Sequence, residues 1–268
     1  MVKEFEAVDL IKDDEQDIFE NLKYAQVIQR GIFPKDRHFE ILFEEHFILY
    51  RPKHLISGDF YWIGRLGKYK CVAVGDCTGH GISAGLISVL TYNLLNYALY
   101  TKQYTNPSDI LSEVDKKFLE SFSSDIEGVA FNNDWVDLSI CVINEEENIL
   151  SFAGARRKLM HVFDNEFNIY KGANYPIGGW QIETNRNFET VEVEYKKGDK
   201  IYLGSDGFQD QMGGEKNKKF KTKRLHNLLL KDSVVPMKEQ LYRLQKEFLL
   251  WKNDQQQQDD VCIIGVKL

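Results

Sequence analysis

Cysteine is scarce in this sequence, and no two cysteines have the close spacing of a redox or zinc motif. The 268 residues include four cysteines, each alone in or beside an apolar run: Cys71, Cys77, Cys141 and Cys262. A disulfide framework or a zinc site needs several cysteines, or cysteines and histidines, at characteristic spacings. We therefore expect four reduced core thiols, no structural zinc and a cytoplasmic protein.

Excess positive charge and uninterrupted apolar runs are also lacking. The formal net charge is −7, which argues against a general nucleic-acid binder and against an anionic-membrane binder. The first 16 residues are acidic and contain no apolar signal-peptide core. Polar side chains interrupt the longest apolar stretch, residues 82–100, which favours a core helix over a membrane span. We expect a protein partner.

The main chemical signal lies in residues 69–100. Residues 70–75 are short, apolar and β-branched, as in a buried strand, and residues 82–100 are typical of a buried helix. Asp76 ends the strand and a glycine-rich turn follows, so the carboxylate is held rigidly while backbone or ligand can approach closely. Four residues separate Asp76 from Gly81, which is too far for a helix cap. The pattern indicates that Asp76 binds a ligand.

Three more acidic positions have a similar setting. Asp206 follows the apolar residues 201–203, Asp259 and Asp260 open the final apolar run, and Asp59 begins an alternating aromatic strand. Carboxylates that meet at low dielectric repel one another unless a cation lies between them. Oxygen ligands without a His or Cys cluster favour Mg²⁺ or Mn²⁺ over Zn²⁺.

Seven segments along the chain, in this order, carry a resemblance to a known family. They are AQVIQRGIFP, RPKHLISGDFYW, VGDCTGHGISAGL, LSFAGARRKL, YPIGG, IYLGSDGFQDQMGG and DDVCIIGV. Each segment alone is weak evidence, because GD and DG pairs are common in turns, but seven such segments in this order are strong evidence. From about Ala25 to Leu268 the chain resembles the metal-dependent serine/threonine protein phosphatases of the PPM superfamily, in the bacterial branch typified by SpoIIE and RsbU.

The resemblance has implications for fold and mechanism. Strands in two blocks with helices in pairs already indicate a layered α+β sandwich. The family implies four layers, α-β-β-α, with two mainly antiparallel sheets and a dinuclear metal site between them. It also implies that two Mn²⁺ or Mg²⁺ ions bridge a hydroxide that hydrolyses phosphoserine or phosphothreonine. We expect a signalling phosphatase from a bacterial partner-switching pathway.

The same resemblance assigns roles to individual residues. It implies that Asp76 bridges both ions, that Asp59 binds one ion, and that Asp206 and Asp259 bind the other. The backbone carbonyl of Cys77 would be a further ligand. Secondary site positions are Asp260, Gly79, His80 and Gly207. If residues 259–266 form a strand, neighbouring side chains point to opposite faces, so only one of the adjacent pair can face the metals. The resemblance implies that this ligand is Asp259.

The chain departs from other branches of the superfamily in two places. The eukaryotic branch has a candidate general acid, a histidine, two positions after the bridging aspartate, where Thr78 stands here. His80 therefore cannot inherit that role, and we expect it to make a local hydrogen bond. The phosphate-binding residue stays unassigned: Arg156 and Arg157 are equally well explained as phosphate ligands and as surface charge.

Two parts are expected, an N-terminal regulatory or linker helix in residues 1–36 and a phosphatase domain in residues 37–268. Residues 17–33 have helical periodicity, and Ile18, Leu22, Ala25, Gln29 and Ile32 form a two-heptad seam. The seam fits a homodimer contact or a helix docked on its own domain equally well. From Phe39 onward the pattern predicts strands.

Several alternatives compete with this assignment. GHGISAG superficially fits a dinucleotide loop, but the acidic residue expected about 20 positions later is absent. An inactive phosphoprotein-binding scaffold of the same fold is the main alternative. The substrate suggested by the resemblance is a phosphorylated, anti-sigma-antagonist-like protein. The basic run in residues 215–226 is read as a solvated face rather than as a steering patch.

Overall fold

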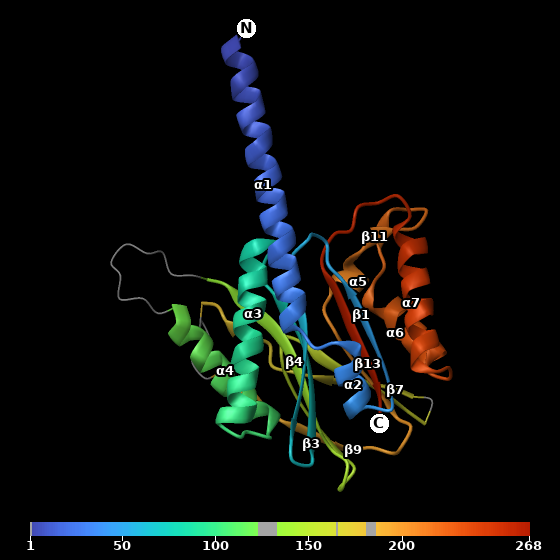
Figure 1. Ribbon diagram of the computed structural model, residues 1–268. Coiled ribbons are helices and arrows are strands. Elements are labelled where there is room, and N and C mark those ends of the chain that lie inside the picture. The colour runs from blue at the N-terminus through green and yellow to red at the C-terminus, as the bar shows by residue number, and fades with distance from the viewer. Residues whose placement is uncertain (1, 123–132, 165, 181–185) are drawn as a thin grey trace.

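The computed structural model describes residues 2–122, 133–164, 166–180 and 186–268, with side chains described from Gln16 onward. Two antiparallel sheets form its centre (Figure 1). Sheet A has the order β1-β13-β10-β6-β7, and sheet B has the order β2-β3-β4-β5-β9, with β8 also paired to β4.

The strand bounds follow the apolar runs of the sequence. Sheet A comprises β1 (Glu45–Arg51), β13 (Val261–Lys267), β10 (Lys200–Gly204), β6 (Lys158–Phe163) and β7 (Glu166–Lys171). Sheet B comprises β2 (Asp59–Leu66), β3 (Tyr69–Cys77), β4 (Trp135–Asn144), β5 (Ile149–Ala155), β8 (Ile177–Gly178) and β9 (Val191–Glu194). A small hairpin pairs β11 (Met212–Gly213) with β12 (Lys218–Lys219).

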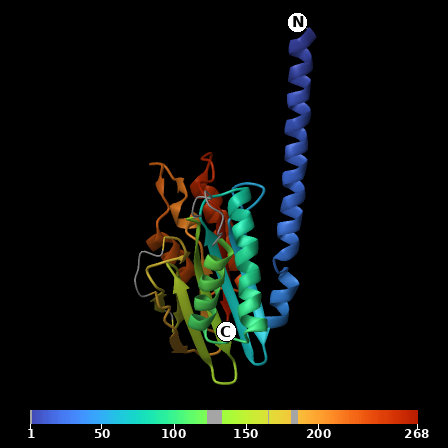
Figure 2. The same cartoon turned by 90° about the vertical axis from the view of Figure 1, so that its left-hand side faces the viewer.

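Helices cover the outer face of each sheet. Sheet B is covered by α3 (Ile82–Asn96), which continues into the short π-helix η1 (Tyr97–Thr101), and by α4 (Pro107–Phe122). Sheet A carries α6 (Thr222–Asp232) and α7 (Met237–Lys252), with the short α5 (Gly207–Asp210) after β10. Three apolar cores separate these layers, and the central core lies between the sheets around Val74, Leu203 and Ile264. This is the expected four-layer α-β-β-α sandwich (Figures 1 and 2).

The apolar stretch after the glycine turn forms a core helix, as expected. By length and composition alone, Ile82–Thr101 passes the test for a membrane-crossing helix. Its residues Ala84, Ile87 and Leu95 are buried in the core beneath sheet B. The Ser88 and Thr91 hydroxyl groups donate hydrogen bonds to backbone carbonyls of the same helix, so both side chains are hydrogen-bonded within the core.

Two element predictions need correction. The segment that begins at Phe39 is not a strand: α2 (Asp36–Leu42) occupies it, and β1 starts only at Glu45. Phe39, Leu42 and Phe43 are all buried, a three- and four-residue spacing that fits one helical face better than a strand. The last strand begins at Val261, so Asp259 and Asp260 precede it.

The N-terminal helix α1 (Val2–Ile32) begins well before the expected Asp17 and projects beyond the sandwich (Figures 1 and 2). Its C-terminal end is docked on the domain. The Gln29 amide donates to the Ser57 carbonyl at 2.7 Å and accepts from the Ser57 N–H at 3.1 Å. Phe33 is buried beside Phe60 and Tyr92. This end therefore fits the docked-helix alternative.

Candidate functional site

Three aspartates lie side by side across sheet B. Asp59 is directly opposite Asp76 on β2 and β3, and Asp76 is directly opposite Asp137 on β3 and β4. Directly opposed residues project from the same face, and like charges in this arrangement destabilise a sheet. The structure thus places Asp59 and Asp76 next to each other and adds Asp137.

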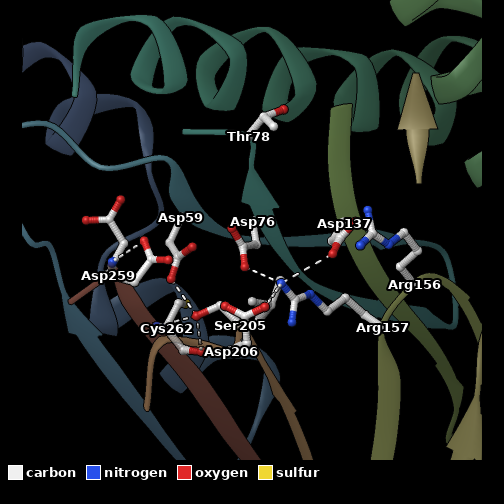
Figure 3. A network of polar contacts seen from close by, with 12 residues as sticks. Asp59, Asp76, Thr78, Asp137, Arg156, Arg157, Ser205, Asp206, Asp259 and Cys262 are labelled. Atoms are coloured by element: carbon white, nitrogen blue, oxygen red, sulfur yellow. Dashed lines mark hydrogen bonds and ion pairs between the residues drawn. The ribbon is translucent and has the colours of Figure 1, made fainter. Parts of the chain in front are cut away.

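Sheet A contributes carboxylates from the other side (Figure 3). Asp206 follows β10, and Asp259 precedes β13. Between the sheets, the Ser205 hydroxyl donates to Asp59 Oδ2 at 2.5 Å and accepts from the Cys262 N–H at 3.0 Å. Ser205 therefore fixes the orientation of a sheet B carboxylate from a sheet A strand end.

Arg157 joins these carboxylates. Its Nη2 donates to Asp76 Oδ2 and, at 3.1 Å, to Asp206 Oδ2, and it lies 3.4 Å from Asp137 Oδ2. The Arg157 side chain is 11% exposed, so these ion pairs are poorly screened by water. Figure 3 shows the Arg157 guanidinium beneath Asp76 and Asp137, while the Arg156 guanidinium lies beside Asp137, with 3.6 Å between Arg156 Nε and Asp137 Oδ1.

Burial and mutual repulsion shift the acid–base properties of the cluster. Burial raises the pKa of Asp76 to about 7, Arg157 opposes this rise, and Asp206, Asp137 and Asp259 add to it. Burial, followed by the charge of Asp76, raises the pKa of Asp59 well above its usual value. Shared protons and Arg157 therefore offset charge repulsion in the absence of another cation.

The two neighbouring aspartates before β13 have different environments. Asp260 is buried, and its two oxygens accept hydrogen bonds from the Lys53 N–H at 2.6 Å and the Gly58 N–H at 2.7 Å. Asp259 accepts one bond, from the Asp260 N–H at 2.8 Å, and burial raises its pKa. Asp260 therefore holds the backbone of residues 53–58 in place, and Asp259 retains a free oxygen.

The glycine turn after Asp76 is held by Thr78. The Thr78 hydroxyl donates to the Trp135 carbonyl and accepts from the Trp135 N–H, both at 2.6 Å. Gly79 and Gly81 have φ angles of +79° and +84°, which favour glycine. His80 is exposed, and its ring packs against that of His54 at 5.0 Å between centroids. Neither Thr78 nor His80 contacts the carboxylates.

Gly207 has a clear steric role. A Cβ atom there would lie 1.9 Å from the Asp260 carbonyl oxygen, so no side chain fits between α5 and the residues before β13. This close approach brings Asp206 and Asp259 onto the same edge of the site. The backbone of Cys77 lies near Gly58, with 3.4 Å between the Cys77 nitrogen and the Gly58 carbonyl oxygen.

Sequence reasoning missed Asp137 and Ser205. Asp137 lies in a long buried strand and is the only charged residue of WVDLSICVIN. That unexplained charge was an available signal, because charged side chains are rarely buried without a partner. Ser205 precedes Asp206 in an ordinary-looking turn, and its contact with Asp59 joins strands far apart in sequence.

The donor set suits hard divalent cations. Asp59, Asp76, Asp206 and Asp259 offer oxygen atoms only, and Asp137 Oδ1 is buried without a hydrogen-bond partner. Within the described ranges, no three His, Cys, Asp or Glu side chains are already spaced to hold an ion. The Arg157 guanidinium lies between Asp76 and Asp206 and donates to one carboxylate oxygen of each.

The four-layer sandwich with its strand-end carboxylates defines the class of PP2C-type serine/threonine phosphatases. The chain belongs to the SpoIIE family, because the family model for stage II sporulation protein E matches residues 67–268. A comparison with curated protein sequences finds no match.

Solved structures share this fold. The SiaA-PP2C domain of Pseudomonas aeruginosa has 29% identity and a TM-score of 0.83, with 95% of this chain and 98% of that chain covered. The PP2C phosphatase domain of SpoIIE from Bacillus subtilis, with a fragment of its regulatory domain, has 19% identity and a TM-score of 0.65, with 84% and 63% covered. RsbX in complex with magnesium has 17% identity and a TM-score of 0.57, with 83% and 94% covered.

Proposed function

We propose that the chain is a metal-dependent phosphatase that hydrolyses phosphoserine or phosphothreonine in a protein. The convergence of Asp59, Asp76, Asp206 and Asp259 at one edge of the two sheets is the observation that carries this proposal. Phosphate-ester hydrolysis requires charge stabilisation on both the attacking and the leaving oxygens. A cluster of anionic oxygen ligands fits a pair of Mg²⁺ or Mn²⁺ ions, and the magnesium complex of RsbX supports this choice.

Each carboxylate has a distinct role in this proposal. Asp76 would bind both ions from the centre of the cluster, Asp59, oriented by Ser205, would bind one ion, and Asp206 and Asp259 would bind the other. The Cys77 carbonyl would be a further ligand. Two divalent ions bound there would supply an activated water for in-line attack on phosphorus. No protein nucleophile is needed.

Arg157 is the phosphate-positioning residue in this proposal. Its planar guanidinium matches two phosphate oxygens, and it already lies among the carboxylates that would hold the ions. Asp137 Oδ2 lies 3.4 Å from Arg157 Nη2. Asp137 would therefore remain a partner that holds the guanidinium at the site if Asp76 and Asp206 bound metal.

The remaining site residues act on structure. Asp260 anchors backbone amides, while Gly79 and Gly207 permit the tight turns beside the two sheet ends. His80 has no contact with the acidic cluster and is not assigned a catalytic step. We place the phosphatase domain at residues 37–268 and a regulatory or linker helix at residues 1–36, in a cytoplasmic protein.

The proposed partners are proteins. The proposed substrate is a phosphorylated, anti-sigma-antagonist-like protein in a partner-switching pathway. A second copy of the chain is the proposed partner of α1. Tyr24, Val27 and Ile28 on α1 are 67%, 63% and 49% exposed and lie at helical spacing, so they form an apolar stripe that pairing would bury.

Phosphate release from three matched peptides tests the proposal. The peptides carry phosphoserine, phosphothreonine or phosphotyrosine in one sequence, and each is incubated with Mn²⁺, Mg²⁺ or chelator. We expect metal-dependent release from the first two peptides and little from the third. Binding of phosphoserine peptide without release in either metal would instead support the scaffold alternative. Release from phosphotyrosine alone would overturn the assignment.

A further inference from the structure

A basic groove extends from the carboxylate cluster along the ends of β6 and β7. Its basic side chains are Arg156, Arg157, Lys158 and Lys171, and Gly172, Ala173 and Asn174 complete a hollow of about 320 Å³. Arg156, Arg157 and Lys158 also line a neighbouring hollow of about 300 Å³ that reaches Asp206. The groove and the proposed catalytic site therefore share one wall.

The pairing of β6 with β7 sets two lysines against each other. Lys158 and Lys171 are directly opposite in the antiparallel register, and like charges in this position destabilise a sheet. Lys158 is half-buried, and burial, together with Arg157 and Lys171, lowers its pKa. Among the described residues, no carboxylate pairs with either lysine. In a chain of net charge −7, this is a local concentration of unmatched positive charge.

The groove wall is rigidly built. Arg156 has a φ angle of +55°, uncommon for a residue with a side chain. Its N–H donates to the Ala173 carbonyl at 2.8 Å, and the Gly172 N–H donates to the Arg157 carbonyl at 3.1 Å. A Cβ at Gly172 would lie 2.3 Å from the Gly154 carbonyl oxygen. The fold thus holds a costly backbone conformation where the basic side chains emerge, a feature typical of functional sites.

We propose that this groove binds acidic side chains next to the phosphorylated residue of the protein substrate. The inference rests on the proposed function, because the groove starts at the Arg157 and Asp206 side of the catalytic site. A phosphoserine held by Arg157 places neighbouring residues of an extended peptide along Lys158 and Lys171. One or two Asp or Glu side chains there supply the anionic partners that both lysines lack. The groove thereby favours substrates that have acidic residues next to the phosphoserine.

Two phosphoserine peptides, identical except for Glu or Gln on both sides of the phosphoserine, test this inference. With Mn²⁺, we expect kcat/KM to be about five- to tenfold higher for the Glu peptide, equivalent to about one or two exposed ion pairs. The preference falls as salt is raised from 50 to 500 mM, because exposed charges are screened. Equal kcat/KM for both peptides would overturn the groove assignment while leaving the phosphatase assignment intact.

The variant Lys171→Glu provides the matched structural test. It places opposite charges across the β6 and β7 pair, so the melting temperature is maintained or raised, while the preference for the Glu peptide falls toward unity. Lys218→Glu makes the same charge change on the exposed hairpin strand β12 and is expected to retain the preference. An equal loss of preference in both variants would show a general charge effect and contradict the groove.

A binding measurement separates the groove from catalysis. Fluorescence anisotropy of the labelled Glu and Gln peptides with metal-free protein needs no turnover. Tighter binding of the Glu peptide, lost in Lys171→Glu, supports the groove even if neither peptide releases phosphate, in which case the proposed function alone fails. Equal affinity for the two peptides counts against the groove.

Discussion

Asp59 and Asp76 are directly opposite each other on β2 and β3, with both side chains on one face of sheet B. Such a pair is unfavourable in the absence of a counter-ion. The Ser205 hydroxyl bond to Asp59 and the Arg157 ion pair with Asp76 show how the fold tolerates it. The arrangement is the structural basis for the predictions that follow.

The role of Arg157 as an internal counter-ion predicts an effect on stability. Arg157→Met leaves Asp76, Asp137 and Asp206 without their shared cation, and breaking a buried ion pair costs roughly 3 kcal/mol or more. We expect the metal-free variant to melt at least several degrees below wild type. Saturating Mn²⁺ should reduce this deficit, because metal ions replace the lost charge.

Arg156→Met is the control for that experiment. Arg156 is exposed and lies 3.6 Å from Asp137, so its loss should have a smaller effect. Calorimetry with and without Mn²⁺ provides the measurement. An Arg157 deficit that is absent without metal, or undiminished with it, would contradict the counter-ion role.

The raised pKa of Asp76 predicts how stability changes with pH. Burial raises this pKa to about 7, so the folded state binds a proton that the unfolded state releases near pH 4. Stability of the metal-free protein therefore falls as pH rises from about 4 to about 7. Asp76→Asn removes the titration, so wild type should lose stability relative to the variant across this window. Denaturant unfolding at pH 5, 6, 7 and 8 tests this; parallel profiles would contradict it.

Asp259 and Asp260 should respond differently to the same substitution. Asp259→Asn removes the charge of a proposed metal ligand and should raise the Mn²⁺ concentration needed for binding. Both Asp260 oxygens accept a hydrogen bond from a backbone N–H group. Asp260→Asn replaces one of these oxygens by an NH₂ group, so one backbone N–H loses its acceptor, and the free energy of unfolding should fall by about 1–3 kcal/mol. Mn²⁺ titration calorimetry and thermal melts of both variants provide the comparison. A larger metal-affinity loss at Asp260 would reverse the two roles.

The exposed stripe on α1 predicts an effect on oligomeric state. If a second copy covers Val27 and Ile28, changing both residues to Asp buries charge in an apolar contact and should yield monomers. Ile18→Asp adds charge at an exposed position on another face of the helix and should retain the dimer. Light scattering gives the mass of each protein. A monomeric wild type would leave only the docked-helix role of Gln29 and Phe33.

The sequence was most informative where an apolar strand ends at a charged residue. Local patterns were enough to predict the strand bearing Asp76, the helix after it and the layered class of fold. They could not show that Asp137 stands beside Asp76, because strand order is set by packing between distant segments. The same limit hid the Ser205 contact with Asp59 and the choice of Arg157 over Arg156. The helix α2 was missed because three apolar residues at helical spacing also fit a short strand.

The bridging role of Asp76 is the central claim, and one measurement tests it most directly. Purified wild type and Asp76→Asn are compared for phosphate release from phosphoserine peptide at saturating Mn²⁺, with circular dichroism as the fold control. The account predicts native-like spectra for both and a loss of activity in the variant to below a few per cent, because the charge that holds both ions is gone. Substantial activity in a folded Asp76→Asn protein would contradict it.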